Sequence, residues 1–364
     1  GRETKHFQKP LLLLWVSLPV MPCLALYSRR FTRLANQFRS FSVAAHDEES
    51  SRTNFDLFNP TEEHQMLRET VRAFADEEVR PQALEFNRSE TFNRRLFDKC
   101  GELGLLGVTV DPEYGGSGMD AVAAVIIHEE LAAADPAFTL SYLAHSMLFV
   151  NNVARNGSEA QKRKFLPKAC TGETICGMCM SEPNAGTDVM GMQTTATKSA
   201  DGKSYVLSGQ KMWITNGTTD GVSTGDAFLV YARTGPKRGD VSSFLVEKNA
   251  PGFTLGQKVA DKCGMRASPT AELVFDQVAV DARDALVGEE NKAALCMMRN
   301  LEIERITLAA MSLGIARASV DAMNRYASER SAFGQHLSSF GQIQRHIADS
   351  YAEYMAGREY SYAE

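Results

Sequence analysis

Cysteine is scarce in this chain, with seven residues among 364. So low and odd a count does not suit a disulfide-stapled extracellular scaffold, and it favours a reducing compartment. An excess of basic charge is also missing, because 39 Lys and Arg face 45 Asp and Glu. The resulting net charge of −6 argues against a protein that binds nucleic acid by neutralising phosphates. The ordinary proportions of hydrophobic and charged residues, 44% and 23%, exclude wholesale disorder.

Signatures of several cofactor and metal sites are missing too. The chain has no GxxxxGK[ST] sequence, and Gly115-Gly-Ser-Gly118 does not match the dinucleotide-binding pattern GxGxxG. The seven histidines are scattered without the spacing of metal ligands. Cys176 and Cys179 form one CxxC pair without a second, and strand alternation explains such a pair as well as zinc does. We therefore expect no metal centre.

Acidic residues are absent from residues 4–46, which carry six Lys and Arg. Phe31, Leu34, Phe38 and Phe41 recur there at helical spacing between arginines, as in a mitochondrial presequence. We expect residues 1–46 to be a removable presequence, the mature protein to lie in the mitochondrial matrix, and Met21 to be an alternative start. The competing interpretation is a secretory signal over residues 11–27, which prolines interrupt. No other stretch is apolar for long enough to predict a membrane span.

The rest of the chain divides into helices, strands and helices, which predicts an α+β fold. Residues 53–174 carry helical periodicity, with a helix that begins at Pro60-Thr61 and is expected to end at Pro81. Residues 175–290 carry short strand patterns, and residues 291–364 return to helix. We therefore expect an N-terminal helical domain, a middle antiparallel β-domain and an incomplete C-terminal helical bundle.

Strand and helix boundaries within these regions can also be predicted. Asp201-Gly202 between two β-prone runs indicates a hairpin. Further short strands are expected at 227–232, 243–247 and 271–275, in a sheet that could form a small barrel. A second C-terminal helix is expected from about Gln342. In the first C-terminal helix, which begins after about residue 291, an apolar stripe is predicted to contain Leu301, Leu308, Met311 and Ile315.

Two runs in the middle region are more specific than any of these patterns. Met180-Ser-Glu-Pro-Asn-Ala-Gly-Thr-Asp188 and Lys211-Met-Trp-Ile-Thr-Asn-Gly217 resemble motifs of the acyl-CoA dehydrogenase family. Further matches follow the family's order over residues 53–364: Tyr114-Gly-Gly-Ser-Gly118, Gly264-Met-Arg266, Gly288-Glu-Glu-Asn291 and Arg330-Ser-Ala-Phe-Gly334. Within the family the chain resembles the isovaleryl-type branch, through Leu140-Ser-Tyr-Leu-Ala-His145, Arg155-Asn-Gly157 and Leu301-Glu-Ile-Glu-Arg305.

The resemblance implies an FAD-dependent reaction that removes the α proton of an acyl-CoA thioester and passes a β hydride to flavin N5. It implies isovaleryl-CoA as the substrate, 3-methylcrotonyl-CoA as the product, a place in leucine catabolism, electron-transfer flavoprotein as the acceptor and a homotetramer. The alternatives are an enzyme for another acyl length or a 2-methyl branch, an acyl-CoA oxidase, and a non-catalytic scaffold that keeps only the fold.

A carboxylate in apolar surroundings suits the base that this chemistry needs. Glu304 shares the stripe of Leu301 and Leu308, whereas Glu302 lies about 160° away on an ideal helix. Both could still be surface glutamates. The isovaleryl-type branch places its base directly before an arginine in this helix, which implies Glu304, with Arg305 and Glu302 at the CoA substrate. An intrahelical ion pair is the alternative role for Arg305.

The resemblance assigns Ser181 to the flavin pyrimidine side and Thr187 to the CoA chain. It assigns Trp213 and Thr215 to the flavin ring, and Arg330 to the FAD pyrophosphate, often of a neighbouring subunit. In the alternative interpretation, the run with Ser181 and Thr187 is an ordinary turn, Trp213 packs in the core and Arg330 is a solvated helix residue. The full FAD set that the resemblance implies is Met178, Met180, Ser181, Thr187, Trp213, Ile214, Thr215 and Arg330.

Three departures from the family's pattern bear on these expectations. Relatives carry a further Gly-rich FAD-contacting segment and last helices after the position of Glu364. Gly341 stands where the isovaleryl type has glutamine, and Leu295 where it has a substrate-contacting tyrosine. The last departure bears on acyl specificity.

Overall fold

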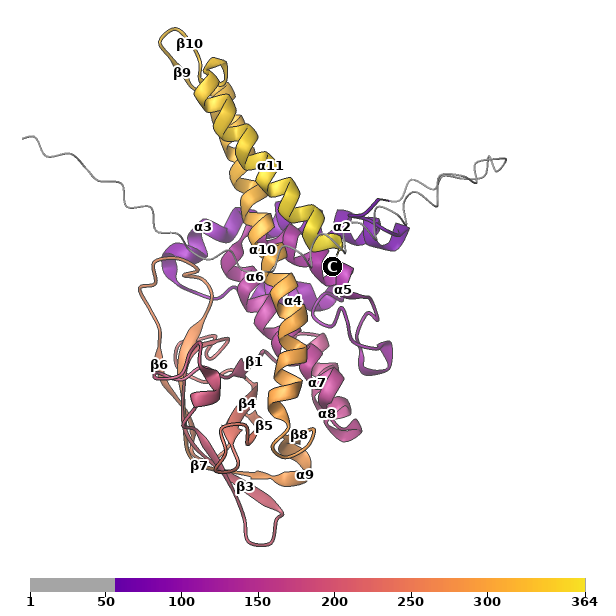
Figure 1. Ribbon diagram of the computed structural model, residues 1–364, viewed down its shortest axis with the longest axis vertical. Coiled ribbons are helices and arrows are strands. Elements are labelled where there is room, and N and C mark those ends of the chain that lie inside the picture. The colour runs from indigo at the N-terminus through magenta and orange to yellow at the C-terminus, as the bar shows by residue number, and fades with distance from the viewer. Residues whose placement is uncertain (1–55, 364) are drawn as a thin grey trace, which may run out of the picture. The chain divides into compact units, whose positions relative to one another are not determined.

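Helices, strands and helices follow one another along the described part of the chain (Figure 1). The computed structural model describes residues 56–363, which belong to one unit. The predicted presequence over residues 1–46 lies outside the described residues. The predicted α+β class is confirmed by this order of elements.

The first helix begins where the sequence predicts. The Thr61 side chain accepts a hydrogen bond from the His64 amide, and two glutamates occupy the first turn. The N-terminal helices are α2 (Glu62–Phe74), α3 (Arg80–Ser89), α4 (Arg94–Glu102), α5 (Ala121–Ala134), α6 (Pro136–Leu143), α7 (Asn151–Asn156) and α8 (Glu159–Cys170), with π-helical turns at Ala75–Val79 and Ala144–Val150.

The expected helix end at Pro81 is wrong. The π-helical turn Ala75–Val79 joins α2 directly to α3, and Pro81 lies in the first turn of α3. Proline is costly in a helix because it lacks the amide donor and its ring collides with the carbonyl four residues earlier. The wider turn changes that carbonyl's position, and Pro81 falls where a missing donor costs least.

The middle region forms one eight-stranded sheet. The Asp201-Gly202 hairpin is confirmed, since β2 and β3 pair antiparallel around it. The strands are β1 (Cys176–Cys179), β2 (Thr195–Lys198), β3 (Ser204–Thr215), β4 (Ala227–Arg233), β5 (Val241–Glu247), β6 (Phe253–Lys258), β7 (Thr270–Asp281) and β8 (Leu286–Val287), with the short helix α9 (Ala282–Ala285) before β8.

Two details of the sheet differ from the prediction. The strand path runs β6-β7-β3-β2-β4-β5-β8 and has two ends, so the sheet is open rather than a barrel. It is also mixed, because β1 pairs parallel with β4 and β2 touches β4 in parallel at Thr195. Parallel neighbours need a crossover connection, and the chain between β1 and β4 supplies it through the β2–β3 hairpin.

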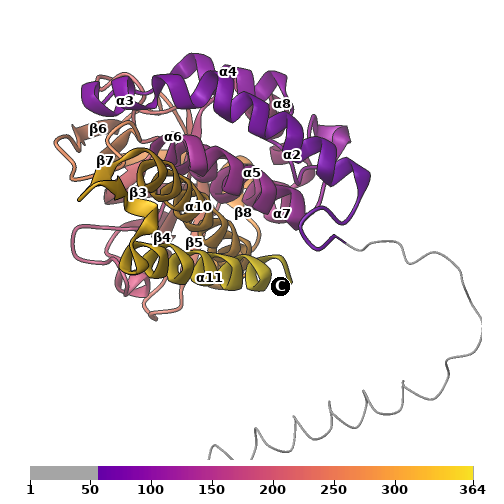
Figure 2. The same ribbon diagram turned by 90° about the horizontal axis from the view of Figure 1, so that it is seen from above.

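Two long helices complete the described chain. These are α10 (Ala293–Glu329) and α11 (Gly341–Ala363), and the short hairpin of β9 (Ser331–Ala332) and β10 (Gln335–His336) joins them at the tip farthest from the sheet (Figure 1). Figure 2 shows α5 between α2 and α10, with α11 beyond α10. Gly314 allows α10 to approach α5, because a Cβ there would lie 2.3 Å from the Glu129 carbonyl oxygen.

The apolar stripe on α10 differs from the predicted one. Met311 is buried, but Leu308 is 37% exposed. Buried positions include Met297, Asn300, Thr307 and Ala310, so the contact face with α5 and the sheet is turned away from Leu308.

By length and composition alone, α10 is also the one described helix that could span a membrane, although no membrane span was expected. Here it packs on α5 and α11 as a helix of the bundle.

A buried ionic cluster joins these helices. Glu129 and Glu130 on α5 are both almost fully buried, and Arg68 from α2 binds both, at 3.0 and 2.7 Å. Arg317 of α10 binds Glu130 at 2.7 Å, and Arg358 of α11 binds Glu129 at 2.7 Å. Each carboxylate is thus compensated from more than one helix, which a buried charge requires.

Candidate active site

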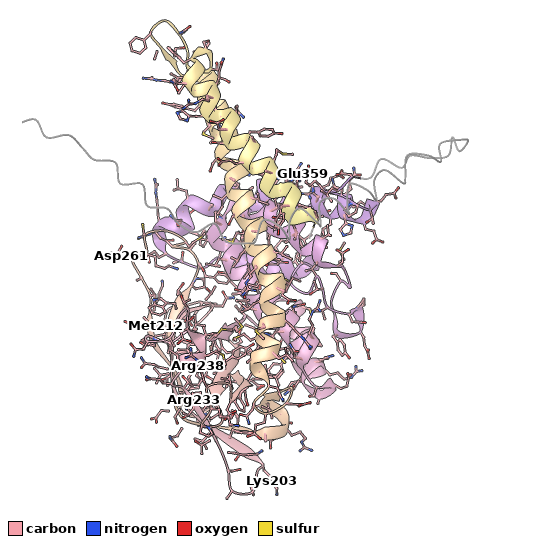
Figure 3. All side chains as sticks on the ribbon, viewed as in Figure 1. Lys203, Met212, Arg233, Arg238, Asp261 and Glu359 are labelled. Carbon is pink, nitrogen blue, oxygen red and sulfur yellow. The ribbon has the colours of Figure 1, made fainter. Side chains whose placement is uncertain are left out.

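A bulge in β3 presents Trp213 to the surface. The register between β3 and β7 shifts between Lys211 and Ile214, and Trp213 takes a φ of 61°. That left-handed backbone costs a non-glycine residue about 1–2 kcal/mol, and such strain is typical of functional positions. The side chain is 52% exposed, so Trp213 is not the core tryptophan that was its alternative interpretation. Figure 3 labels the neighbouring Met212.

The loop after β1 is tied to this bulge by backbone and side-chain bonds. The Met212 amide donates to the Ser181 carbonyl at 2.9 Å. Lys211, fully buried, donates to the Met180 carbonyl at 3.0 Å and to the Glu182 carboxylate at 2.9 Å. The two motifs that resemble the family's flavin site are therefore brought together.

Glu182 also ties this loop to the start of β2. Its carboxylate accepts the amides of Gln193 and Thr194 at 2.6 and 3.0 Å. Burial opposes its ionisation, but the Lys211 charge and these amides outweigh burial and lower the pKa of Glu182. Burial lowers the pKa of Lys211, and Glu182 opposes that shift. We infer a charged pair, because each ion has further hydrogen bonds that stabilise its charge.

The end of β3 is anchored to the helices. Asn216 has a φ of 62°, and its buried amide donates to the carbonyls of Ser141 at 2.9 Å and Cys176 at 3.0 Å. Gly177 allows β1 to pass close by, since a Cβ there would lie 2.7 Å from the Thr215 carbonyl oxygen. Thr215 is half-buried beside this contact. Seven of the eight predicted FAD residues lie on β1, its following loop and β3: Met178, Met180, Ser181, Thr187, Trp213, Ile214 and Thr215.

Arg330 lies apart from these seven residues. It caps the C-terminus of α10 beside the β9–β10 hairpin, at the opposite end of that helix from the sheet (Figure 1). Its side chain is exposed. A single chain therefore does not bring Arg330 to the other predicted residues.

Glu302 and Glu304 on α10 have different environments. Glu304 is half-buried, and its Oε2 is fully buried without a hydrogen-bond partner among residues 56–363. Burial raises the pKa of Glu304, and Arg305 opposes the shift. Glu302 and Arg305 are exposed, and neither has an ion pair within the described part of the chain. The intrahelical pair considered for Arg305 is absent there.

Sequence reasoning missed the polar residues around Glu304 and the role of Lys211. Asn151, Asn300 and Tyr231 are buried on three separate elements. Glu182, the partner of Lys211, lies 29 residues away in the sequence, so no local pattern predicts the pair. The sequence Gly221-Val-Ser-Thr-Gly225 has the spacing of a hydrolase nucleophile, but Ser223 Oγ donates to Asp220 at 2.6 Å in an exposed turn rather than a strand-to-helix elbow.

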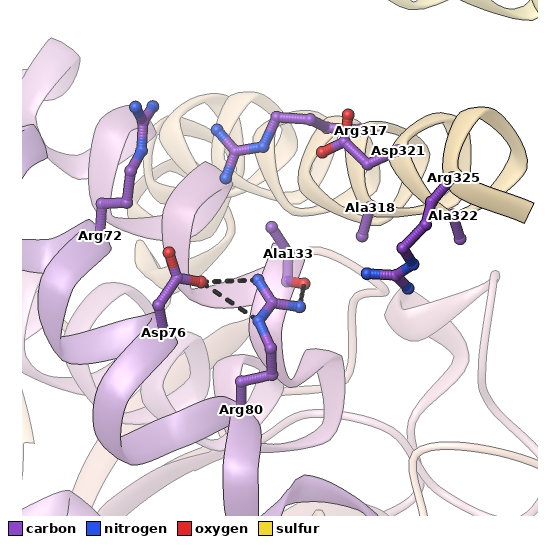
Figure 4. Close-up of a pocket in the computed structure, with 9 residues that line it drawn as sticks. All are labelled: Arg72, Asp76, Arg80, Ala133, Arg317, Ala318, Asp321, Ala322 and Arg325. Atoms are coloured by element: carbon purple, nitrogen blue, oxygen red, sulfur yellow. Dashed lines mark hydrogen bonds and ion pairs between the residues drawn. The ribbon is translucent and has the colours of Figure 1, made fainter. Parts of the chain in front are cut away.

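A cavity of about 470 Å³ between α2, the following π-helical turn and α10 contains none of the predicted site residues (Figure 4). It is lined by Arg72, Arg80, Arg317 and Arg325 among others. Arg80 binds Asp76 at 2.8 Å, and Arg72 and Arg317 both bind Glu130. The cavity therefore belongs to the ionic packing of the helices.

Comparisons with known proteins account for the two tied motifs. Three family descriptions match in order: the N-terminal domain of acyl-CoA dehydrogenase at residues 61–173, the middle domain at 177–278 and the C-terminal domain at 294–363. The chain belongs to the acyl-CoA dehydrogenase family. It is therefore an oxidoreductase whose cofactor is FAD.

Individual relatives agree with this assignment. Mitochondrial isovaleryl-CoA dehydrogenase of Pongo abelii is 43% identical over 83% of this chain and 71% of its own length. The structure of butyryl-CoA dehydrogenase from Megasphaera elsdenii matches with a TM-score of 0.78 and 34% identity, over 87% of this chain and 80% of that chain. Glutaryl-CoA dehydrogenase of Mycobacterium smegmatis in complex with FADH2 matches with a TM-score of 0.77 and 30% identity, over 83% of this chain and 75% of that chain.

Proposed function

We propose that the chain catalyses the FAD-dependent α,β-dehydrogenation of a short branched acyl-CoA, with isovaleryl-CoA as the substrate and 3-methylcrotonyl-CoA as the product. Glu304 is the base that removes the α proton. The observation that carries this role is the buried Oε2 of Glu304, which has no partner among residues 56–363, on a helix whose neighbouring Glu302 is solvated. Leucine catabolism in the mitochondrial matrix, transfer of electrons to electron-transfer flavoprotein and a homotetramer complete the proposal, and the family resemblance supports them.

A thioester α proton is very weakly acidic, so its base must bind protons better than a solvated carboxylate does. Burial provides this property, because it favours the neutral form of Glu304 and raises the pKa of its carboxyl. Arg305 next to it opposes the shift and keeps the ionised form accessible. The carboxylate thus accepts a proton more readily than a solvated glutamate does.

The residues around the β3 bulge fit a planar, partly polar cofactor. The Trp213 ring offers an exposed aromatic face, Ser181 and Thr215 offer hydroxyl groups, and a Cβ built on Gly186 would meet no atom within 4 Å. We assign Met178, Met180, Ser181, Ile214 and Thr215 to FAD with Trp213 and Thr187, and Arg330 to the FAD of a neighbouring subunit. Bound FAD supplies the hydride acceptor.

Three exposed residues are assigned to the CoA part of the substrate. Arg305 has no carboxylate partner among the described residues, so its guanidinium is free to bind phosphate oxygens. Thr187 and Glu302 are exposed as well and can contact the CoA chain.

The decisive experiment compares Glu304→Gln with the matched control Glu302→Gln. We expect Glu304→Gln to retain FAD and acyl-CoA binding and to lose reduction of the flavin by at least about a thousandfold, because an amide cannot accept the proton. At saturating acyl-CoA the Glu302→Gln variant should reduce its flavin at nearly the unaltered rate, because Glu302 is assigned to binding of the CoA chain and not to proton transfer. Anaerobic titration with isovaleryl-, butyryl- and octanoyl-CoA, followed by bleaching of the flavin band, measures both variants and the substrate preference.

Each outcome of this comparison bears on a different part of the proposal. Unchanged reduction in Glu304→Gln would remove Glu304 as the base. Bleaching at the lowest concentration by butyryl- or octanoyl-CoA would retain the dehydrogenase and reject the isovaleryl substrate. A chain that binds FAD but is bleached by no acyl-CoA would instead support the scaffold alternative.

A further inference from the structure

Asn151 connects the N-terminal helices to α10 through its side-chain amide. Arg155 Nε donates to Asn151 Oδ1 at 3.3 Å, and the Thr109 hydroxyl donates to the same oxygen at 3.0 Å. Because a guanidinium only donates, the Asn151 atom that faces Arg155 must be the oxygen. Its Nδ2 is therefore the atom that faces Asn300, and it donates to Asn300 Oδ1 at 3.0 Å.

This chain of bonds determines which way the amide of Asn300 is turned. Its oxygen is committed to Asn151, so the atom left over is the donor Nδ2. Asn300 is 3% exposed, and Nδ2 is buried without a partner among residues 56–363. A buried donor without an acceptor costs about 1–3 kcal/mol, so a structural reason for it should exist nearby.

The complementary atom lies one helical turn away on the same helix. Glu304 follows Asn300 by four residues, and its Oε2 is a buried acceptor without a partner in the described chain. Side chains at i and i+4 are neighbours on a helix surface. Helical side chains also lean toward the N-terminus, so the Glu304 carboxylate leans toward the turn that carries Asn300.

We propose that Asn300 is a positioning residue for Glu304: when the carboxylate is ionised, its side chain turns toward Asn300, and Nδ2 donates to Oε2 and holds it in the orientation that accepts the substrate proton. In the structure the two atoms are not hydrogen-bonded to each other, since each has no partner among residues 56–363. This inference rests on the proposed role of Glu304 as the base. Asn300 thereby favours the ionised carboxylate in a setting where burial disfavours it.

Other groups near Glu304 act on its ionisation as well and have to be separated from Asn300. Arg305 lies on α10 beside it, and Cys296 lies two turns earlier. Burial is the main cause that raises the pKa of Tyr231 on β4, and Cys296 and Glu304 add to that rise. The Tyr231 hydroxyl accepts the amide of Asn152 at 3.3 Å and is the competing donor. The Tyr231→Phe variant tests that competitor.

The test uses Asn300→Asp and Asn300→Leu in the FAD-loaded protein. The aspartate substitution retains an oxygen that accepts from Asn151 and replaces only the donor, whereas leucine removes both bonds. The first readout is the pH dependence of flavin reduction by acyl-CoA in stopped-flow mixing. The second readout does not depend on turnover. It is the infrared band of the protonated Glu304 carboxyl, identified by its loss in Glu304→Gln, and the pH at which half of that band is present is measured.

We expect both midpoints to rise by about one pH unit in Asn300→Leu, which slows reduction about tenfold on the acid side. The rise should be larger in Asn300→Asp, because a second carboxylate then faces Glu304. Tyr231→Phe should leave the midpoints in place. Reduction lowered equally at every pH, with unmoved midpoints, would overturn the inference and leave Asn300 a packing residue.

A midpoint that moves in Tyr231→Phe and not in the Asn300 variants would assign the role to Tyr231 instead. Failure of the underlying proposal has a different signature. If Glu304→Gln reduces its flavin at the unaltered rate, the base itself is misassigned, whatever the Asn300 variants do. An inactive Glu304→Gln together with unmoved midpoints in the Asn300 variants overturns only the inference about Asn300.

Discussion

Breaking the buried pair of Lys211 and Glu182 should affect both stability and FAD retention. Lys211→Met keeps most of the length of the side chain and removes its charge, which leaves the Glu182 carboxylate buried with its two backbone amides alone. Removal of one partner from a buried ion pair costs about 3–5 kcal/mol. The same change releases the Met180 carbonyl, so the loop that we propose to contact the flavin loses one of its bonds to β3.

The magnitude can be isolated by a double-mutant cycle with Glu182→Gln. Because the double variant carries no uncompensated charge, it should recover about half of the stability that Lys211→Met loses. Denaturant unfolding of the apoprotein gives the free energies, and fluorescence titration with FAD gives the affinity. If the stability lost in the double variant equals the sum of the losses in the two single variants, the argument is refuted, because independent residues do not couple. Lys198→Met, which removes an exposed lysine from its pair with Glu290, is the control and should cost less than about 1 kcal/mol.

Three more perturbations follow from the same geometry. Gly314→Ala should destabilise the protein by about 1–3 kcal/mol in thermal unfolding, because its Cβ would collide with the Glu129 carbonyl and push α10 from α5. Ala316→Gly, at a half-buried position of the same helix, should cost only about 1 kcal/mol. Trp213→Gly should stabilise the apoprotein by about 1 kcal/mol, since glycine adopts the φ of 61° freely, while it weakens FAD binding; loss of stability would contradict the strain. Burial would raise the pKa of Glu130, but hydrogen bonds from Arg317 and others hold it at about 2, so its stabilisation is complete above pH 4.5 and disappears as the pH falls toward 2. Glu130→Gln should lose that acid-dependent part in unfolding measured against pH.

Local signals were sufficient to predict several elements. Thr61 caps α2 with its own hydroxyl, and Asp201-Gly202 supports a tight turn between β2 and β3. Caps and turns depend on residues within about four positions, so the sequence carries their whole cause. The strands at β4, β5 and β7 were predicted for a similar reason, since β-branched and aromatic residues gather in short runs there.

The family and its cofactor could also be recognised from the sequence, because ordered motifs over some 300 residues are specific even when each motif is short. Periodicity separated Glu304 from Glu302 only weakly. The structure separates them clearly, through a buried carboxylate oxygen on one and an exposed side chain on the other. Which face of α10 is buried depends on α5 and the sheet, and no pattern within the helix contains those partners.

The sequence by itself therefore determined the order of helices and strands and the family, and through the family resemblance it indicated the motifs of the proposed flavin site and Glu304 as the candidate base. Tertiary structure alone decided that the helix continues through Pro81, that Trp213 is exposed on a strained bulge, and that Asn300 meets Asn151 from 149 residues away. The physical reason is the range of the forces involved. Turns and caps are local in the chain, whereas burial and the pairing of buried polar groups depend on segments that only the folded protein brings together.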